Sequence, residues 1–272
     1  MIPAPFTYKR ASSVDEALQL AAQGGDDAKF LAGGHSLLPL MKLRLAVPEI
    51  LVDIGRLGEL RYIRDDGSHI AVGALTSHDE MARSGLLGSE LPLLAHAAGQ
   101  VGDPQVRHRG TIGGSLAHAD PASDLPAVIL ALDATLVASG PSGSREIAAG
   151  EFFRGLFESA LRPGELLTEI RIRRPQAAGW SFQKFTKRAI DWAIVGVAVQ
   201  GDSVALVNMG QTPLRASAVE RAMASGAGPR DAAAHAAEGS SPPDDISAGR
   251  GYREHLARVL VARALEESRS RA

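Results

Sequence analysis

The chain has 272 residues, of which 45% are hydrophobic, and a formal net charge of −2. This length allows one to three domains, since domains usually contain roughly 100–200 residues. The near-neutral charge gives no reason to expect nucleic acid or an anionic membrane as a partner. There is no cysteine, which excludes disulfides, thiolate zinc sites and cysteine-ligated iron–sulfur clusters within the chain. Any redox chemistry therefore requires an organic cofactor.

The sequence predicts a cytoplasmic protein. Residues 1–5 do not form a charged segment that leads into an apolar one, so no signal peptide is expected. No apolar run approaches the roughly 20 residues that a membrane-spanning helix needs.

The first third of the chain predicts a β-α-β arrangement. Ser13, with Glu16 three residues later, is a capping-box pattern that predicts the start of a helix, and Gly24-Gly25 predicts its end. The elements expected next are a strand over 28–31, a helix over 37–45 and a strand over 50–54.

The middle of the chain is less regular. The expected elements are strands over 69–75, 135–138 and 166–172 and helices over 77–83, 91–100 and 127–132. Between them, residues 102–126 are rich in turn formers and charge and show no clean period. A polar stretch of this length inside a compact domain is usually functional or disordered, and its order of glycines and prolines favours function.

A boundary is expected at 173–176, where two arginines precede a proline. The elements predicted beyond it are strands over 180–185, 193–200 and 204–209, helices over about 215–225 and 230–238, a loop over 239–245 and a last amphipathic helix.

Two glycine-rich segments, 32–36 and 111–115, are the best candidates for a binding site. A Gly-Gly pair lets backbone N–H groups turn toward an anion without a Cβ in the way. A helix that starts directly afterwards, as expected for the first segment, adds the positive end of its dipole. Two such segments could hold the two phosphates of a dinucleotide, although each Gly-Gly alone is equally compatible with an ordinary tight turn.

The standard nucleotide and hydrolase motifs are absent from the sequence. There is no Gly-x-Gly-x-x-Gly, so a Rossmann NAD site lacks its fingerprint. There is also no P-loop, no His-Glu-x-x-His and no Gly-x-Ser-x-Gly nucleophile elbow.

Three longer motifs follow one another along the chain. The first is Ala32-Gly33-Gly34-His35-Ser36-Leu37-Leu38-Pro39 with Lys42-Leu43-Arg44. The second is Gly102-Asp103-Pro104-Gln105-Val106-Arg107, then Arg109-Gly110-Thr111-Ile112-Gly113-Gly114-Ser115, then Asp120-Pro121-Ala122-Ser123-Asp124-Leu125-Pro126. The third is Lys184-Phe185 with Arg188, Asp191, Ala193 and Val195-Gly196-Val197-Ala198. In order and spacing they resemble the FAD-binding medium subunits of the carbon monoxide dehydrogenase and xanthine dehydrogenase family of molybdenum hydroxylases.

The resemblance extends over essentially the whole chain and implies an α+β fold. It would be a two-lobed FAD-binding fold of the PCMH/vanillyl-alcohol-oxidase type, followed by an α+β C-terminal domain with a three-stranded sheet. The implied domains are an N-terminal lobe (1–58), a second lobe (59–175) and a C-terminal flavin-subunit domain (176–272). FAD would lie extended between the two lobes, with its ring near the C-terminal domain.

The resemblance also implies which residues bind FAD. The cofactor-binding residues would be Ala32, Gly33, Gly34, His35, Ser36, Leu37, Thr111, Ile112, Gly113, Gly114, Ser115, Asp124, Leu166 and Lys184. The two glycine segments would hold the diphosphate, and Asp124 would make a further polar contact. Leu166 would pack near the flavin ring, beside which Lys184 would stabilise the reduced flavin as a fixed cation. Many relatives have asparagine in place of Ser115, which affects one side-chain contact.

Plainer interpretations exist for the two charged site residues. Lys184 could be an exposed lysine on a strand. Asp124 could cap the helix that starts at Leu125, a common role for aspartate. Arg107 and Arg109 could pair with phosphate or simply lie in solvent on a surface loop.

Two other chemistries can be drawn from the same stretch. His118, Asp120 and Asp124 are residue types that bind metals, and His118 with Ser123 and Asp124 could be drawn as a hydrolytic triad. Neither is favoured, because triad members need separate elements that bring them together. His35 is interpreted as a residue that shapes the first glycine segment.

The resemblance implies an electron-transfer subunit with FAD as its cofactor. It would work beside a large molybdenum–pterin subunit and a small [2Fe–2S] subunit, in a heterotrimer that pairs into a dimer of heterotrimers, and pass electrons to an external acceptor. The alternatives are a stand-alone flavin-dependent reductase or oxidase of the same fold, such as the enolpyruvyl-glucosamine reductases, and a non-redox assembly protein that has lost FAD. The substrate and the acceptor are not identified by this chain.

Overall fold

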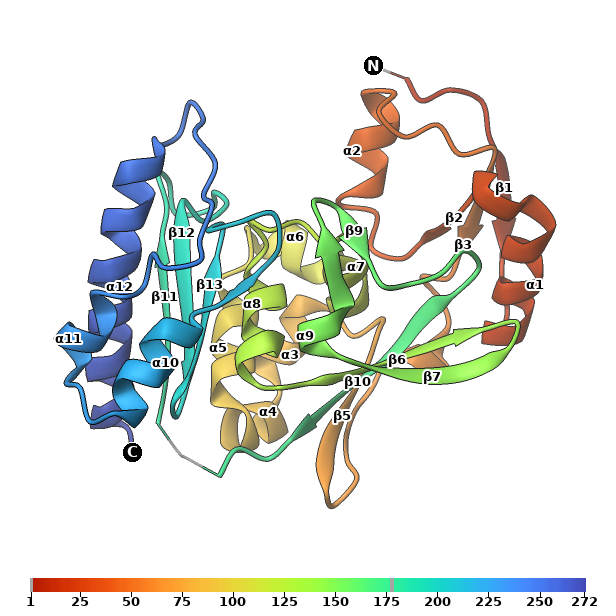
Figure 1. Cartoon of the computed structure of the whole chain (residues 1–272). Helices are drawn as coiled ribbons and strands as arrows, with labels where there is room; N and C mark the ends of the chain where they lie inside the picture. Colours follow the sequence, from red (N-terminus) through yellow and green to blue (C-terminus); the bar gives the residue numbers. More distant parts are fainter. Residues whose placement is uncertain (1, 177–178) are drawn as a thin grey trace.

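The computed structural model describes residues 2–176 and 179–272, which form three main sheets in succession across the molecule (Figure 1). A parallel three-stranded sheet comes from the N-terminal region, a five-stranded antiparallel sheet from the middle and a four-stranded antiparallel sheet from the C-terminal region. This mixture of helices with largely antiparallel sheets confirms the predicted α+β class.

The N-terminal sheet has the order β1-β3-β2, and its strands are connected by helices. Its elements are β1 (Thr7–Arg10), α1 (Val14–Gly24), β2 (Ala28–Leu31), α2 (Leu37–Lys42) and β3 (Ile50–Asp53). Helix α1 begins as predicted, because the Glu16 N–H donates to the Ser13 hydroxyl (3.1 Å). The Glu16 carboxylate, however, accepts from Ser12 and does not close a capping box on Ser13. Strand β1 was not expected, because all four of its residues are exposed and give no hydrophobic signal.

The central sheet has the order β4-β5-β10-β6-β7. Its strands are β4 (Ile63–Asp65), β5 (His69–Gly73), β6 (Thr135–Gly140), β7 (Gly143–Ala148) and β10 (Leu166–Arg173). The neighbouring elements are α3 (His78–Arg83), α4 (Gly85–Glu90), α5 (Pro92–Gly99), α9 (Ala149–Phe152), β8 (Phe153–Gly155) and β9 (Glu158–Ser159).

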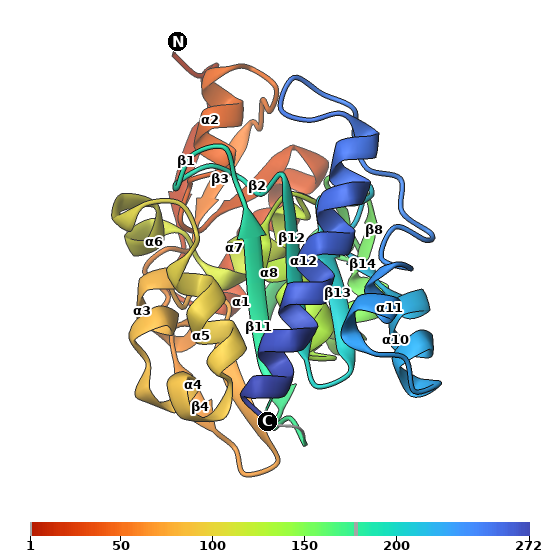
Figure 2. The same ribbon diagram turned by 90° about the vertical axis from the view of Figure 1, so that its left-hand side faces the viewer.

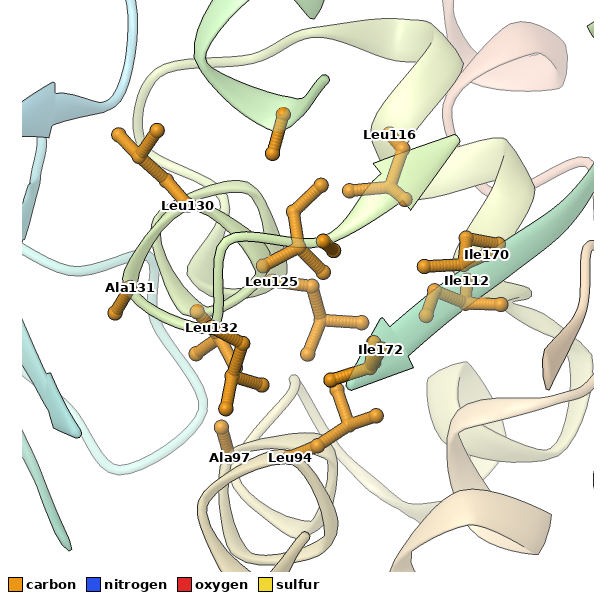
Figure 3. Close-up of a cluster of buried hydrophobic side chains, with 14 of the residues drawn as sticks. Leu94, Ala97, Ile112, Leu116, Leu125, Leu130, Ala131, Leu132, Ile170 and Ile172 are labelled. Atoms are coloured by element: carbon orange, nitrogen blue, oxygen red, sulfur yellow. The ribbon is translucent and has the colours of Figure 1, made fainter. Parts of the chain in front are cut away.

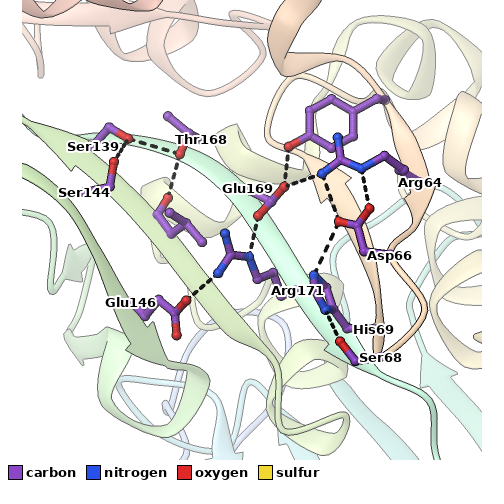
Figure 4. Close-up of polar contacts among 12 residues, drawn as sticks. Arg64, Asp66, Ser68, His69, Ser139, Ser144, Glu146, Thr168, Glu169 and Arg171 are labelled. Atoms are coloured by element: carbon purple, nitrogen blue, oxygen red, sulfur yellow. Dashed lines mark hydrogen bonds and ion pairs between the residues drawn. The ribbon is translucent and has the colours of Figure 1, made fainter.

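The two faces of this sheet differ in polarity. Ile170 and Ile172 of β10 are fully buried and pack with the helices in the main hydrophobic core (Figure 3). The alternate residues Glu169 and Arg171 point to the other face, where they form an ion pair within a polar network (Figure 4). This alternation is expected for a sheet with one buried face.

Residues 102–126, for which no period was found, are largely helical. They contain α6 (Pro104–Arg109), α7 (Ile112–His118) and the start of α8 (Asp124–Ala131). Asp103 caps α6 by accepting from the Val106 N–H (2.9 Å), and Pro104 occupies its first position. Helices of six to eight residues are too short for a 3.6-residue period to be recognised, which explains the missed prediction.

The C-terminal sheet has four strands, so the expectation of three is wrong. Its elements are β11 (Trp180–Phe185), β12 (Val195–Gln200), β13 (Ser203–Val207), β14 (Leu214–Arg215), α10 (Ser217–Ala224), α11 (Pro229–Ala233) and α12 (Arg250–Ser270). The fourth strand contains only two residues, too few to show an alternation. Figure 2 shows α12 running along this sheet, while α8 packs against its other face. No helix within the described ranges is long and apolar enough to cross a membrane.

Candidate functional site

A cavity of about 770 Å³ lies where the three parts of the chain meet. All of the predicted site residues line it except Ile112. Ile112 is fully buried in the hydrophobic core, and its backbone N–H donates to the Thr76 carbonyl (3.0 Å). The cavity therefore collects residues that are up to about 150 positions apart in the sequence, from Ala32 to Lys184.

The first glycine segment presents unpaired backbone donors. Among the described residues, none accepts a hydrogen bond from the backbone N–H of Gly33, Gly34, His35 or Ser36. Gly34 has a φ of +80°, a conformation that favours glycine. Helix α2 follows at once, so this segment keeps the arrangement expected of an anion site.

The second glycine segment differs from the prediction. It is the first turn of α7 and not a loop, with Thr111 as the capping residue. The Gly113 N–H donates to the Ala74 carbonyl (2.8 Å), and the Gly114 N–H donates to the Thr111 hydroxyl (3.1 Å). The Ser115 N–H donates to the Thr111 carbonyl (3.0 Å). These donors are already paired, so the expectation that this segment offers free N–H groups is wrong.

The glycines here serve close packing. A Cβ on Gly113 would lie 2.6 Å from the Ala74 Cβ. A Cβ on Gly33 would lie 2.1 Å from the backbone carbonyl oxygen of Arg109, two residues before the second segment. No real Cβ makes contacts this short. Glycine is therefore required at both positions for the backbone to come this close to its neighbour. The first segment is thereby held directly against the end of α6.

Lys184 and Asp124 form a buried ion pair at the cavity wall. The Lys184 Nζ lies 2.7 Å from the Asp124 Oδ2 and donates to the Gln100 carbonyl (3.1 Å). The two side chains are 6% and 5% exposed, so Lys184 is not the exposed strand lysine of the plainer interpretation. Burial raises the pKa of Asp124 to about 6, and the neighbouring ammonium opposes that rise. The second carboxylate oxygen of Asp124 is buried without a partner in the described chain.

The helix-cap interpretation of Asp124 is also wrong. Asp124 is the first residue inside α8, and Ser123 is the capping residue. The Ser123 hydroxyl caps nothing, because it is hydrogen-bonded to the hydroxyl of Ser115 (2.8 Å). Ser115 therefore links α7 to the start of α8.

The metal and triad alternatives have no geometric support. The His118 ring packs at a tilt against Phe157, with 5.1 Å between centroids, and the Asp120 carboxylate accepts from the Ala122 N–H. Ser123 and Asp124 are engaged as described above. Across residues 2–176 and 179–272, no group of three or more His, Cys, Asp and Glu residues is placed to hold a metal ion.

The remaining basic residues lie beside the cavity. His35 is exposed on the first segment, consistent with its interpretation as a loop residue. Arg107 donates to the carbonyls of Val101 and Gly102 (3.0 and 3.1 Å), so it fixes the entry to α6. Arg109 is exposed, in agreement with the surface interpretation.

The sequence did not single out several residues that line the cavity. His78, the first residue of α3, is 4% exposed. Ile190 and Trp192 follow β11 and are 59% and 58% exposed. The position of Trp192 within the third motif was a sequence signal for that residue. No local sequence pattern indicates that α3 approaches the glycine segments.

Two family models together match nearly the whole chain. Residues 4–175 match the family model described as the FAD binding domain in molybdopterin dehydrogenase. Residues 180–268 match the CO dehydrogenase flavoprotein C-terminal domain.

Individual relatives match over their full length. The carbon monoxide dehydrogenase medium chain of Hydrogenophaga pseudoflava is 41% identical, with 100% of this chain and 99% of the relative covered. The 6-hydroxypseudooxynicotine dehydrogenase complex subunit alpha of Paenarthrobacter nicotinovorans is also 41% identical, with 100% and 97% covered. Among solved structures, carbon monoxide dehydrogenase from Hydrogenophaga pseudoflava superposes with a TM-score of 0.94 over the whole of both chains, at 41% identity. The chain therefore belongs to the family of FAD-binding medium subunits of molybdenum hydroxylases, as an oxidoreductase subunit whose cofactor is FAD.

Proposed function

We propose that FAD lies in the 770 Å³ cavity with its diphosphate on the first glycine segment. The observation that carries this proposal is the run of unpaired backbone N–H groups from Gly33 to Ser36, directly before α2. Such groups bind an anion through hydrogen bonds and through the helix dipole together. The second glycine segment lies beside the first, since a Cβ on Gly114 would be 4.0 Å from the Ala32 Cβ, an ordinary van der Waals distance.

The cavity wall has a chemical composition that suits FAD at its other end as well. Leu166 supplies an apolar surface, and Lys184 with Asp124 supplies a charged pair. The unpartnered oxygen of Asp124 is a buried acceptor, and buried acceptors are normally satisfied. A hydrogen-bond donor on the isoalloxazine ring would satisfy it. In this proposal Lys184 stabilises negative charge on the ring, and Asp124 holds the ammonium in place.

When bound, FAD would supply the redox chemistry of the chain, which relays electrons from [2Fe–2S] clusters to an external acceptor. The clusters must belong to a partner, because this chain has no cysteine. We therefore propose that the chain works with a large molybdenum–pterin subunit and a small [2Fe–2S] subunit, as a dimer of heterotrimers in the cytoplasm. The predicted domains, 1–58, 59–175 and 176–272, are kept as part of this proposal, with one main sheet in each.

Relatives of equal identity are named for carbon monoxide and for 6-hydroxypseudooxynicotine. The role of this chain is the same in either case.

Purification of the tagged chain from cells that produce the whole complex tests this function. We expect three different chains in equal amounts, with molybdenum and iron on the partners and flavin on this chain. A chain that purifies alone and oxidises a substrate without partners would contradict the proposal and favour the stand-alone reductase or oxidase.

A further inference from the structure

His78 is a buried residue of the cavity that no function described so far requires. It is 4% exposed, opens helix α3 and lines the cavity between the two glycine segments. Within the described part of the chain, neither ring nitrogen forms a hydrogen bond; only Nδ1 is fully buried, so Nε2 is the nitrogen that a ligand in the cavity can reach. A buried imidazole normally has a partner for each nitrogen, so this exception requires an explanation.

The ring is held firmly in its position. The His78 backbone N–H donates to the Gly110 carbonyl (3.0 Å). A Cβ on Gly110 would lie 2.8 Å from Cδ2 and 2.9 Å from Nε2 of the imidazole, so this edge of the ring packs on the Gly110 backbone. One residue earlier, Ser77 forms a full capping box with Glu80. His78 is therefore fixed against the residue that precedes Thr111, directly beside the second segment.

The surroundings keep the ring neutral. Burial, with smaller contributions from the nearby side chains of His35 and Arg107, lowers the pKa of His78 to about 4. A neutral imidazole carries one N–H donor and one acceptor nitrogen. His78 therefore acts through a hydrogen bond, and the protein gains no charge at this point near neutral pH.

We propose that the neutral ring of His78 donates a hydrogen bond to the diphosphate of FAD and so fixes it between the two glycine segments. This inference rests on the proposed FAD site and adds a side-chain ligand to the backbone donors of Gly33 to Ser36. A donor to an anionic oxygen stabilises a complex more than a bond between neutral groups does. Its loss is therefore measurable as affinity.

The experiment compares His78→Leu, His78→Asn and His78→Gln in the complex after removal of its flavin. The leucine fills the site without a donor. The asparagine amide nitrogen stands near the place of Nδ1, and the glutamine amide nitrogen stands near the place of Nε2. The control is His255→Leu, since His255 is an exposed histidine on α12. Dissociation constants come from FAD fluorescence titration, and the ³¹P NMR resonances of bound FAD report on the diphosphate.

We expect His78→Leu to weaken FAD binding by about 10- to 100-fold, as for loss of a hydrogen bond to a charged group. Its ³¹P resonances should shift, and one of the two amide variants should recover most of the affinity. The flavin-free form of His78→Leu should melt no lower than wild type, because an unpaired buried polar group has been removed. The rise in melting temperature upon addition of FAD should shrink.

Two results would overturn the inference. One is a leucine variant that binds FAD as tightly as wild type with unchanged ³¹P resonances. The other is an equal loss in all three variants, which would assign the effect to packing. If the wild-type complex itself bound no FAD, the proposed function would fail instead, so the two failures are distinguishable.

Discussion

Replacement of Lys184 by methionine tests the buried ion pair through the pH dependence of stability. The variant removes an ammonium that lies 2.7 Å from Asp124 while keeping a similar volume. The carboxylate then stays buried in α8 without its cation. Breaking a buried pair in this way typically costs about 3–5 kcal/mol, because one charge is left uncompensated.

The cost depends on whether Asp124 is ionised. Its pKa in the folded protein is about 6, against the ordinary 3.8, so the folded state binds a proton more tightly than the unfolded state between these values. Stability contributed by this group is therefore present at low pH and is lost as the pH rises through about 6, by roughly 3 kcal/mol in all. Removal of Lys184 takes away the interaction that lowers this pKa, so the penalty grows at higher pH.

We expect Lys184→Met to lose about 3–5 kcal/mol at pH 8 and only about 1–2 kcal/mol at pH 5, where a neutral carboxyl loses ordinary hydrogen bonds. Urea unfolding of the flavin-free chain, followed by circular dichroism at both pH values, measures the difference. The control is Lys187→Met, since Lys187 is exposed three residues away. The double variant with Asp124→Asn should recover much of the loss at pH 8. Equal losses at pH 5 and pH 8 would refute the reasoning.

The other predictions concern the glycine segments and the flavin. Gly114→Val should weaken FAD binding by more than about 100-fold. The valine Cβ would lie 2.9 Å from the Thr111 hydroxyl, and its methyl groups would crowd the cavity beside Ala32. Retention of wild-type affinity in a titration would disprove this role. Gly33→Ala should cost about 1–3 kcal/mol in the free energy of unfolding, because the Cβ would meet a backbone carbonyl at 2.1 Å. Gly58→Ala, at a position with open space, should cost far less. Finally, Lys184→Met should lower the flavin midpoint potential by an amount on the order of tens of millivolts. An unchanged potential in spectroelectrochemistry would show that Lys184 does not stabilise the reduced flavin.

Local patterns predicted the elements that have a clear buried face. The strands Trp180–Phe185 and Val195–Gln200 were identified from their runs of apolar residues, and helix α1 was identified from the helical period of its apolar residues. Exposed β1, the two-residue β14 and the short helices α6 and α7 lack such a period. Their existence depends on caps and on partners elsewhere in the fold.

The motifs named part of the cavity lining, whereas the chemistry of the cavity depends on tertiary contacts. The sequence assigned both Gly-Gly pairs the same task, that of holding the diphosphate. The structure separates them, because the N–H groups of the second pair bond to Ala74 and Thr111 and those of the first do not. The Lys184–Asp124 pair joins residues 60 positions apart, and His78 reaches the cavity only because α3 packs against the end of α6. No local pattern contains that information.

The most direct test of the account is an equilibrium titration of the flavin-free complex with FAD, followed by absorbance and fluorescence. We expect saturable binding of one FAD for each copy of this chain, with most of the affinity lost in Gly114→Val and retained in Gly58→Ala. Absence of saturable binding, or equal binding by all three proteins, would contradict the assignment of the cavity as the FAD site.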